Sequence, residues 1–142
     1  MPGAARSSHL EGDRPLFDRV TGRYQQFQQA VERTRAGEWN AEDFEAFLLH
    51  VFETLTEKAV DCRAFIEESR YHEEAPEEVE AGLRGVDLYE VGMQELWQYL
   101  QDGDAGHLEE GLRLLWEGNE KINEAMRINR ESREDLDLNF FL

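Results

Sequence analysis

Residues 76–126, PEEVEAGLRGVDLYEVGMQELWQYLQDGDAGHLEEGLRLLWEGNEKINEAM, decide the fold because two apolar helical repeats flank one short turn. The run from Asp102 to Gly106, DGDAG, is typical of a turn. The repeat before it comprises Val79, Leu83, Val86, Met93, Trp97 and Leu100, and the repeat after it comprises Leu108, Leu112, Leu115, Ile122 and Met126. Spacings of three, four and seven residues place each set on one face of a helix. The stretch therefore predicts a helical hairpin.

The glycines of this hairpin indicate how closely its helices pack. Facing residues of an antiparallel pair have position numbers with a constant sum, and a sum of 207 gives the pairs Gly82/Ala125, Gly85/Ile122, Tyr89/Gly118, Gly92/Leu115, Leu96/Gly111 and Leu100/His107. A glycine inside a helix costs about 1 kcal/mol relative to alanine. Close packing of large side chains into glycine holes would offset that cost. We therefore predict that Gly82, Gly85, Gly92, Gly111 and Gly118 are helix-packing residues.

Two further helices are predicted upstream. Residues 1–14 mix small and polar residues without a period, which predicts a mobile N-terminal tail. Pro15 can stand near a helix start, Gly37 can end that helix, and the residues between them that mark its apolar face are Val20, Tyr24, Phe27 and Val31.

The next helix has the best start signal in the chain. Asn40 can cap it with Asp43 three residues on, and Trp39 with Phe44 matches a hydrophobic staple. Its apolar face comprises Phe44, Phe47, Leu48, Val51, Phe52, Leu55, Ala59, Cys62 and Ile66, and the set is wide enough near its start to predict neighbours on two sides. Residues 71–75 are predicted to form a polar connection, and Pro76 opens the third helix.

Four amphipathic helices with short connections predict an all-α protein, an antiparallel up-down-up-down four-helix bundle over residues 15–135. The fourth helix is expected to run to about Asp135. The other hairpins also have workable registers: a sum of 75 faces Phe27 with Leu48, and a sum of 145 faces Phe52 with Met93.

The charge distribution narrows the possible partners. The chain of 142 residues carries a net charge of −17, with a net of +2 in residues 1–35 and of −19 in residues 36–142. Such a surface repels phosphate backbones and anionic lipid, so neither nucleic acid nor membrane is an expected ligand. It attracts basic protein surfaces, although acidic helix faces also serve solubility alone. Without an apolar membrane span or a secretory signal, a cytoplasmic location is expected.

Catalytic and metal-binding patterns are missing. A di-metal bundle needs Glu-x-x-His pairs, and the residue three before His50 is Phe47, whereas the residue three before His72 is Ser69. Cys62 lies on an apolar stripe and is expected to be a buried structural thiol. Glu90 is the only acid found in an apolar row and is expected at its rim. We therefore predict no enzyme activity, metal or cofactor.

The C-terminus is the most unusual segment because it ends in large apolar residues. Its predicted protein-interaction residues are Asp135, Leu136, Asp137, Leu138, Phe140, Phe141 and Leu142. The tail, residues 136–142, either folds back over an open groove of its own bundle or docks on a partner with its phenylalanines as anchors. Trp97, Trp116, Leu114 and Ile128 look surplus to the bundle and could seat the tail or a second protomer.

These observations favour a non-catalytic adaptor or scaffold, which docks on a protein partner through a helix face, the C-terminal tail, or both. Homo-oligomerisation is a possible use of the surplus apolar residues. Two alternatives remain: an acidic inhibitor that mimics nucleic acid in a basic site, and a metal-binding or enzymatic bundle. The first alternative predicts binding that moderate salt abolishes.

Overall fold

A computed structural model describes residues 22–69, 71–74, 76–132 and 141 of the chain. These residues form helix α3 (Gly22–Arg35), helix α4 (Ala41–Ser69), the single-turn helix α5 (Tyr71–Glu74), helix α6 (Pro76–Asp102) and helix α7 (Gly106–Ser132). No strand occurs within these ranges, so the predicted all-α class is confirmed. The predicted helix start at Pro15 and the predicted end at Asp135 lie outside the described residues.

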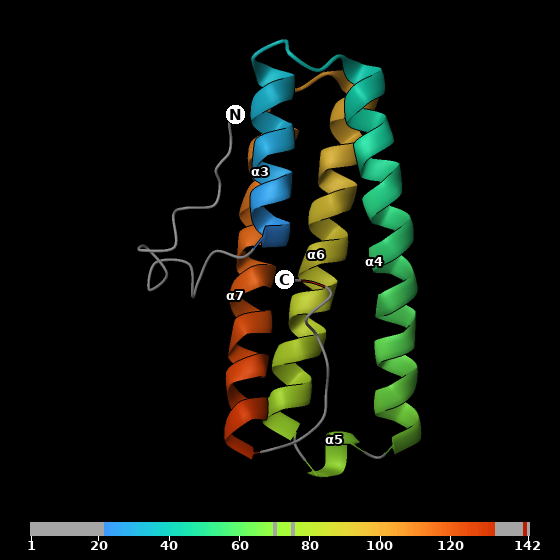
Figure 1. The fold of residues 1–142 in the computed structure, drawn as a ribbon, viewed down its shortest axis with the longest axis vertical. Helices are drawn as coiled ribbons and strands as arrows, with labels where there is room; N and C mark the ends of the chain where they lie inside the picture. Colours follow the sequence, from blue (N-terminus) through green and yellow to red (C-terminus); the bar gives the residue numbers. More distant parts are fainter. Residues whose placement is uncertain (1–21, 70, 75, 133–140, 142) are drawn as a thin grey trace.

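The four long helices lie side by side along the long axis of the molecule (Figure 1). Successive long helices alternate in direction in this view, as their colours show. Helix α6 contacts α7 and α4, and α3 contacts α4 and α7. Each long helix therefore has two long neighbours, an arrangement that is consistent with a bundle.

The connection between α3 and α4 follows the predicted signals. Gly37 has a φ of +81°, and the Glu38 amide donates to the Arg33 carbonyl at 2.9 Å, which ends α3 in a Schellman turn. The Asp43 amide donates to Asn40 Oδ1 at 2.8 Å, and the Asn40 amide donates to Asp43 Oδ2 at 3.1 Å. This reciprocal pair confirms the predicted cap, and it satisfies two backbone donors at the start of α4.

Two local predictions need correction. Trp39 makes its ring contact with Phe47, at a centroid distance of 5.8 Å, whereas the predicted staple partner Phe44 is fully buried against Tyr99. The reason is that Phe44 continues the core row of α4, so its ring turns inward. The predicted polar connection at residues 71–75 contains the helical turn α5.

Among the described helices, α6 and α7 form the most extensive contact. A Cβ atom at Gly85 would lie 2.6 Å from Ile122 Cγ1, and one at Gly92 would lie 2.9 Å from Leu115 Cγ. A Cβ at Gly111 would lie 2.5 Å from Leu96 Cδ2. These are pairs that the sum of 207 places opposite one another. Backbone therefore packs against side chain without room for an added methyl group.

The two remaining expected packing positions are Gly118 of α7 and Gly82 of α6. A Cβ at Gly118 would lie 2.9 Å from the Gly85 carbonyl oxygen and 3.2 Å from the Tyr89 amide nitrogen. Gly82 is buried, as is Ala125, its expected partner on α7. Glycine is thus used here for close approach rather than for unusual backbone angles.

Aromatic rings join the other helix pairs. Phe52 of α4 meets Trp97 of α6 with ring centroids 5.9 Å apart, and Phe44 meets Tyr99 at 6.0 Å. The position numbers of these pairs add to 149 and 143, which bracket the predicted 145. Trp116 of α7 meets Tyr24 of α3 edge-to-face at 5.4 Å. Trp97 and Trp116 therefore join helices, which corrects the expectation that they are surplus to the bundle.

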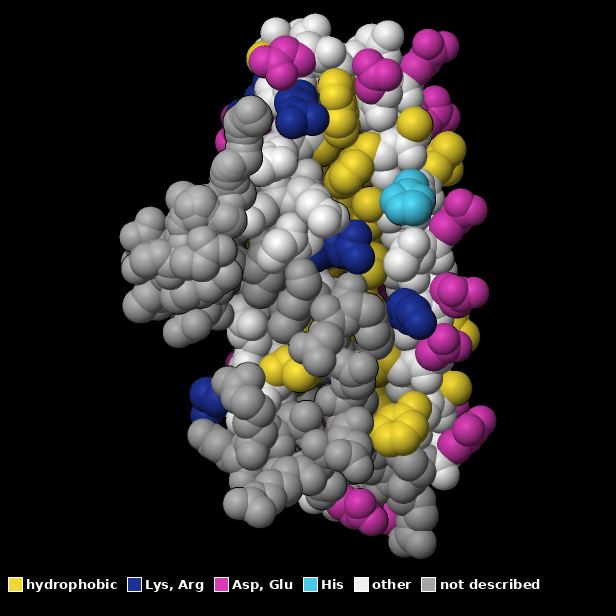
Figure 2. All heavy atoms as spheres, viewed as in Figure 1, with side chains coloured by type: hydrophobic (Ala, Val, Ile, Leu, Met, Phe, Trp, Pro, Cys, Tyr) yellow, Lys and Arg dark blue, Asp and Glu magenta, His cyan; other side chains and the backbone are white. Residues whose placement is uncertain are grey.

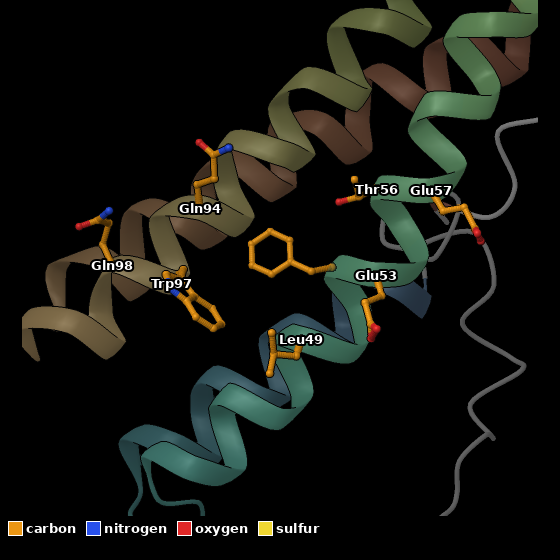
Figure 3. A pocket seen from close by; sticks show the side chains of 8 residues that line it. Leu49, Glu53, Thr56, Glu57, Gln94, Trp97 and Gln98 are labelled. Carbon is orange, nitrogen blue, oxygen red and sulfur yellow. The ribbon is translucent and has the colours of Figure 1, made fainter.

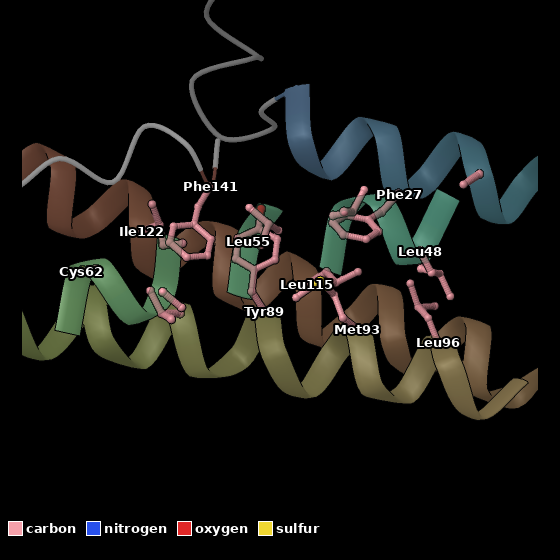
Figure 4. Close-up of a cluster of buried hydrophobic side chains, with 14 of the residues drawn as sticks. Phe27, Leu48, Leu55, Cys62, Tyr89, Met93, Leu96, Leu115, Ile122 and Phe141 are labelled. Carbon is pink, nitrogen blue, oxygen red and sulfur yellow. The ribbon is translucent and has the colours of Figure 1, made fainter. Parts of the chain in front are cut away.

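Phe141, in the C-terminal tail, belongs to the core (Figure 4). Its side chain is fully buried and stacks on Tyr89 with ring centroids 5.6 Å apart. Tyr89 also contacts Phe27 at 6.3 Å, so one tyrosine of α6 lies between a ring of α3 and a ring of the tail. At Phe141 the structure agrees with the fold-back alternative, and this ring is not an exposed docking anchor. The predicted interaction residues Asp135, Leu136, Asp137, Leu138, Phe140 and Leu142 lie outside the described residues.

The side chain of His107 links α7 to α6 near the turn that connects the two helices. His107 Nδ1 lies 2.6 Å from Glu95 Oε2, and His107 Nε2 lies 2.8 Å from Asp102 Oδ2. Both ring nitrogens donate only when the imidazole is protonated. The hydrogen bond to Glu95, followed by that to Asp102, raises the pKa of His107 above its ordinary value.

We predict that His107 stabilises the hairpin in a pH-dependent way. Because the folded-state pKa is raised, the contribution is fully present below the unfolded-state pKa of about 6.5 and is lost as pH rises through the folded-state pKa. The free energy of unfolding of wild type and His107→Gln, measured by urea denaturation from pH 5.5 to 9, should differ most at low pH. His50→Gln, which removes an exposed histidine of α4, is the control. A difference independent of pH would contradict the prediction.

Candidate functional site

An apolar groove between α4 and α6 is the candidate functional site. We call it the α4–α6 groove, and it is lined by Leu49, Phe52, Glu53, Thr56, Glu57, Gln94, Trp97 and Gln98 (Figure 3). It is open to solvent and has a volume of about 940 Å³. Its lining comes from about two turns of α4 and one turn of α6, so both walls are rigid helical elements.

Helical spacing explains why these residues share one side of α4. Leu49, Glu53 and Thr56 follow one another at steps of four and three, and Phe52 lies between this row and the core row. The early part of α4 was predicted to contact neighbours on two sides, and Phe52 makes the second contact, against Trp97. Phe52 and Trp97 remain only partly buried, and Leu49 is 46% exposed. Apolar surface is thus left open to solvent.

The two rims of the groove differ in charge. Glu53 and Glu57 are exposed on the α4 rim, whereas Gln94 and Gln98 are exposed on the α6 rim. In Figure 3 both pairs extend away from the labelled Trp97 and Leu49. The described lining residues include no basic side chain. The α4 rim therefore presents two exposed carboxylates beside an apolar floor.

A charged cluster lies further along the same helix pair. Arg63 of α4 pairs with Asp87 at 2.5 Å and with Glu90 at 3.0 Å, both on α6. The hydrogen bond to Glu90 is the largest cause that raises the pKa of Arg63. Glu90 is partly exposed, as the rim position predicted for it requires. Arg63 is thus already neutralised by two carboxylates and adds no free positive charge to the groove.

Exposed acidic side chains line the outer surface of α4. Figure 2 shows them along the edge of this helix, with a band of hydrophobic side chains between α3 and α4. The exposed acids of α4 are Glu42, Asp43, Glu45, Glu53, Glu57, Asp61, Glu67 and Glu68. Large apolar side chains also reach the surface on this helix, at Val60 (59% exposed) and Phe65 (43% exposed), and on α6 at Val91 (47% exposed).

Reactive and metal-binding groups are sparse in the described part of the chain. Burial raises the pKa of the Cys62 thiol, which is the opposite of what an activated nucleophile needs. No group of three or more histidine, cysteine or acidic residues is placed to hold a metal ion within the described ranges. A second hollow, lined mainly by Glu77, Glu80, Arg84, Lys121, Glu124 and Arg127, carries charges of both signs. It offers no apolar contact comparable with the α4–α6 groove.

Glu78 is a buried acid that the sequence pattern did not indicate, since Glu90 was the only acid predicted near an apolar row. Glu78 is fully buried near the start of α6. Its position precedes Gly82 by four residues and Gly85 by seven, so helical spacing could have placed it on the packing face. Its place in an acidic run suggested a solvated helix end instead.

The residues predicted on α7 for protein interaction do not form the candidate site. Leu114 and Trp116 are partly buried, and Trp116 contacts α3. The groove residues Leu49 and Phe52 were assigned to the core face or left without a role. The signal that could have found the groove was the number of apolar residues near the start of α4, which is larger than one buried face requires. Trp97, which looked surplus to the bundle, was a second signal.

No protein-family model matches the chain, and no curated protein and no solved structure matches it either. Among the described helices, none is long and apolar enough to cross a membrane. The α4–α6 groove is therefore interpreted from its own geometry.

Proposed function

We propose that this chain is a non-catalytic protein-interaction module, an antiparallel up-down-up-down bundle that docks a protein partner through a helix face. The observation that carries the proposal is the α4–α6 groove, where Leu49, Phe52 and Trp97 leave apolar surface open between two rigid helices. Open apolar surface rimmed by polar groups is typical of protein–protein contact sites. We propose an adaptor or scaffold role on this basis. The net negative charge of the chain favours a partner with a basic surface.

Partner capture at two salt concentrations tests this proposal. The tagged chain and its Leu49→Glu variant capture proteins from the cell extract at about 0.05 and about 0.3 M NaCl, since the Debye length falls to below about 10 Å across this range. We expect wild type to retain partner proteins at the higher salt. The amount captured by Leu49→Glu should be about tenfold lower. Val60→Glu, an exposed apolar-to-acid change outside the lining residues, should retain them.

The same experiment tests the nucleic-acid mimic. An acidic inhibitor of a basic site would lose its partner at the higher salt and would be insensitive to Leu49→Glu. That result would overturn docking through the apolar groove and favour the mimic.

A further inference from the structure

We infer that the occupant of the α4–α6 groove is an amphipathic α-helix of a partner protein, with an apolar face flanked by Lys or Arg. This inference rests on the proposed function and specifies its partner. The lining residues of α4 run from Leu49 to Glu57, which is about 12 Å of helix at 1.5 Å per residue. A channel between two neighbouring helices accepts a third helix by the helix-in-groove mode.

The groove floor selects apolar side chains at helical spacing. Phe52 and Trp97 meet edge-to-face with an interplanar angle of 66°, and Leu49 stands beside them with nearly half of its surface exposed. Aromatic walls of this kind are favoured contacts for aliphatic and aromatic anchors. Two or three such anchors at steps of three and four residues would cover the floor and leave the other faces of the bound helix free.

The acidic rim selects the charge of the bound helix. Glu42, Glu45, Leu49, Glu53 and Thr56 succeed one another at steps of three and four along one side of α4, so carboxylates continue the rim beyond the groove itself. Glu57 adds another charge to the lining. Lys or Arg beside the apolar face of the bound helix would meet these carboxylates.

Charge also argues against a second copy of this chain as the occupant. The chain has a net charge of −17, and both surfaces of a self-association would carry the same sign. On the α6 rim, Gln94 and Gln98 are neutral and can donate or accept hydrogen bonds. The basic flank of the bound helix should therefore lie along α4, and a neutral polar flank along α6.

A panel of four fluorescein-labelled 18-residue peptides tests the inference by anisotropy in about 0.15 M NaCl, where the Debye length is about 8 Å. The first has leucines on one helical face and lysines elsewhere, the second has glutamine in place of lysine, and the third has glutamate. The fourth has the leucine and lysine composition in scrambled order. We expect the first peptide to bind at least about tenfold more tightly than each of the others, a difference of about 1.4 kcal/mol.

Variants of the chain locate the binding. Leu49→Glu should weaken binding of the leucine–lysine peptide by about tenfold or more, because it places a charge on the apolar floor. Separately, Glu53→Lys with Glu57→Lys should weaken it by a similar factor, because charge reversal replaces attraction with repulsion.

The matched control is Glu32→Lys with Glu80→Lys, the same change in net charge at exposed positions outside the lining. Glu80 precedes the lining residue Gln94 by 14 residues of α6, which is about 21 Å of helix. This control variant should weaken binding by less than about threefold, since charges beyond a Debye length are screened. Circular dichroism checks that each variant folds.

The outcomes separate the inference from the proposed function. Equal binding of the lysine and glutamine peptides, dependent on Leu49, would overturn the basic partner and leave docking through the groove intact. Equal binding of the scrambled peptide would overturn the helical occupant. Equal loss in the control variant would overturn the selection of a basic flank by the α4 rim. Absence of Leu49-dependent binding by any peptide would overturn both. A dimer in sedimentation velocity that Leu49→Glu converts to monomer would show that a second copy occupies the groove.

Discussion

Gly118→Ala should lower the free energy of unfolding by about 2–3 kcal/mol, although alanine is the better helix former by about 1 kcal/mol. The added Cβ would lie 2.9 Å from the Gly85 carbonyl oxygen and 3.2 Å from the Tyr89 amide nitrogen. These are backbone atoms of α6, which cannot rotate away as a side chain can. Helices α6 and α7 would therefore have to separate, and contacts along the whole pair would loosen.

Thermal and urea denaturation measure this effect, with an expected fall in Tm of about 5–10 °C. Gly106→Ala is the matched control because Gly106 is exposed at the start of α7, and the three atoms nearest to an added Cβ, the closest at 3.2 Å, all belong to the exposed Asp104 side chain. This control should change stability by no more than about 0.5 kcal/mol. A neutral or stabilising Gly118→Ala would show that α6 and α7 do not approach as closely as the structure places them.

Phe141→Ala should produce the largest loss of stability among single substitutions in the C-terminal segment, about 3–5 kcal/mol. The ring is fully buried and stacks on Tyr89, so its removal leaves a cavity and forfeits an aromatic contact. Phe141→Leu should cost less, because leucine fills most of the volume. The free energy of unfolding from urea denaturation, followed by circular dichroism, is the measurement.

Deletion of residues 136–142 extends this test to the whole tail. If the tail completes the core, the truncated chain should lose at least as much stability as Phe141→Ala. If stability holds and a captured partner is lost instead, the tail is a docking peptide. A Phe141→Ala variant as stable as wild type would overturn the placement of this ring in the core.

The periodic pattern of the sequence was sufficient for the helices and for their start and end signals. Asn40 with Asp43 and the turn glycines Gly37 and Gly103 act through neighbours within five residues, so their geometry is local. The glycine pairs of α6 and α7 were also predictable, because one short turn sets the register of both helices. The candidate site was not, because exposure of Leu49 depends on how far α6 lies from α4.

By itself, the sequence determined the acidic charge of the chain, the helical class of its described part, the turns at Gly37 and Gly103, and the glycine positions between α6 and α7. These features follow from interactions between residues near in sequence, or across one tight turn. Only the tertiary structure decided that Phe141 returns to Tyr89, that Trp116 contacts Tyr24, and that Leu49 borders an open groove. These outcomes depend on the separation and rotation of whole helices. Many weak contacts between residues far apart in the sequence determine that separation and rotation together, so a local sequence pattern does not predict them.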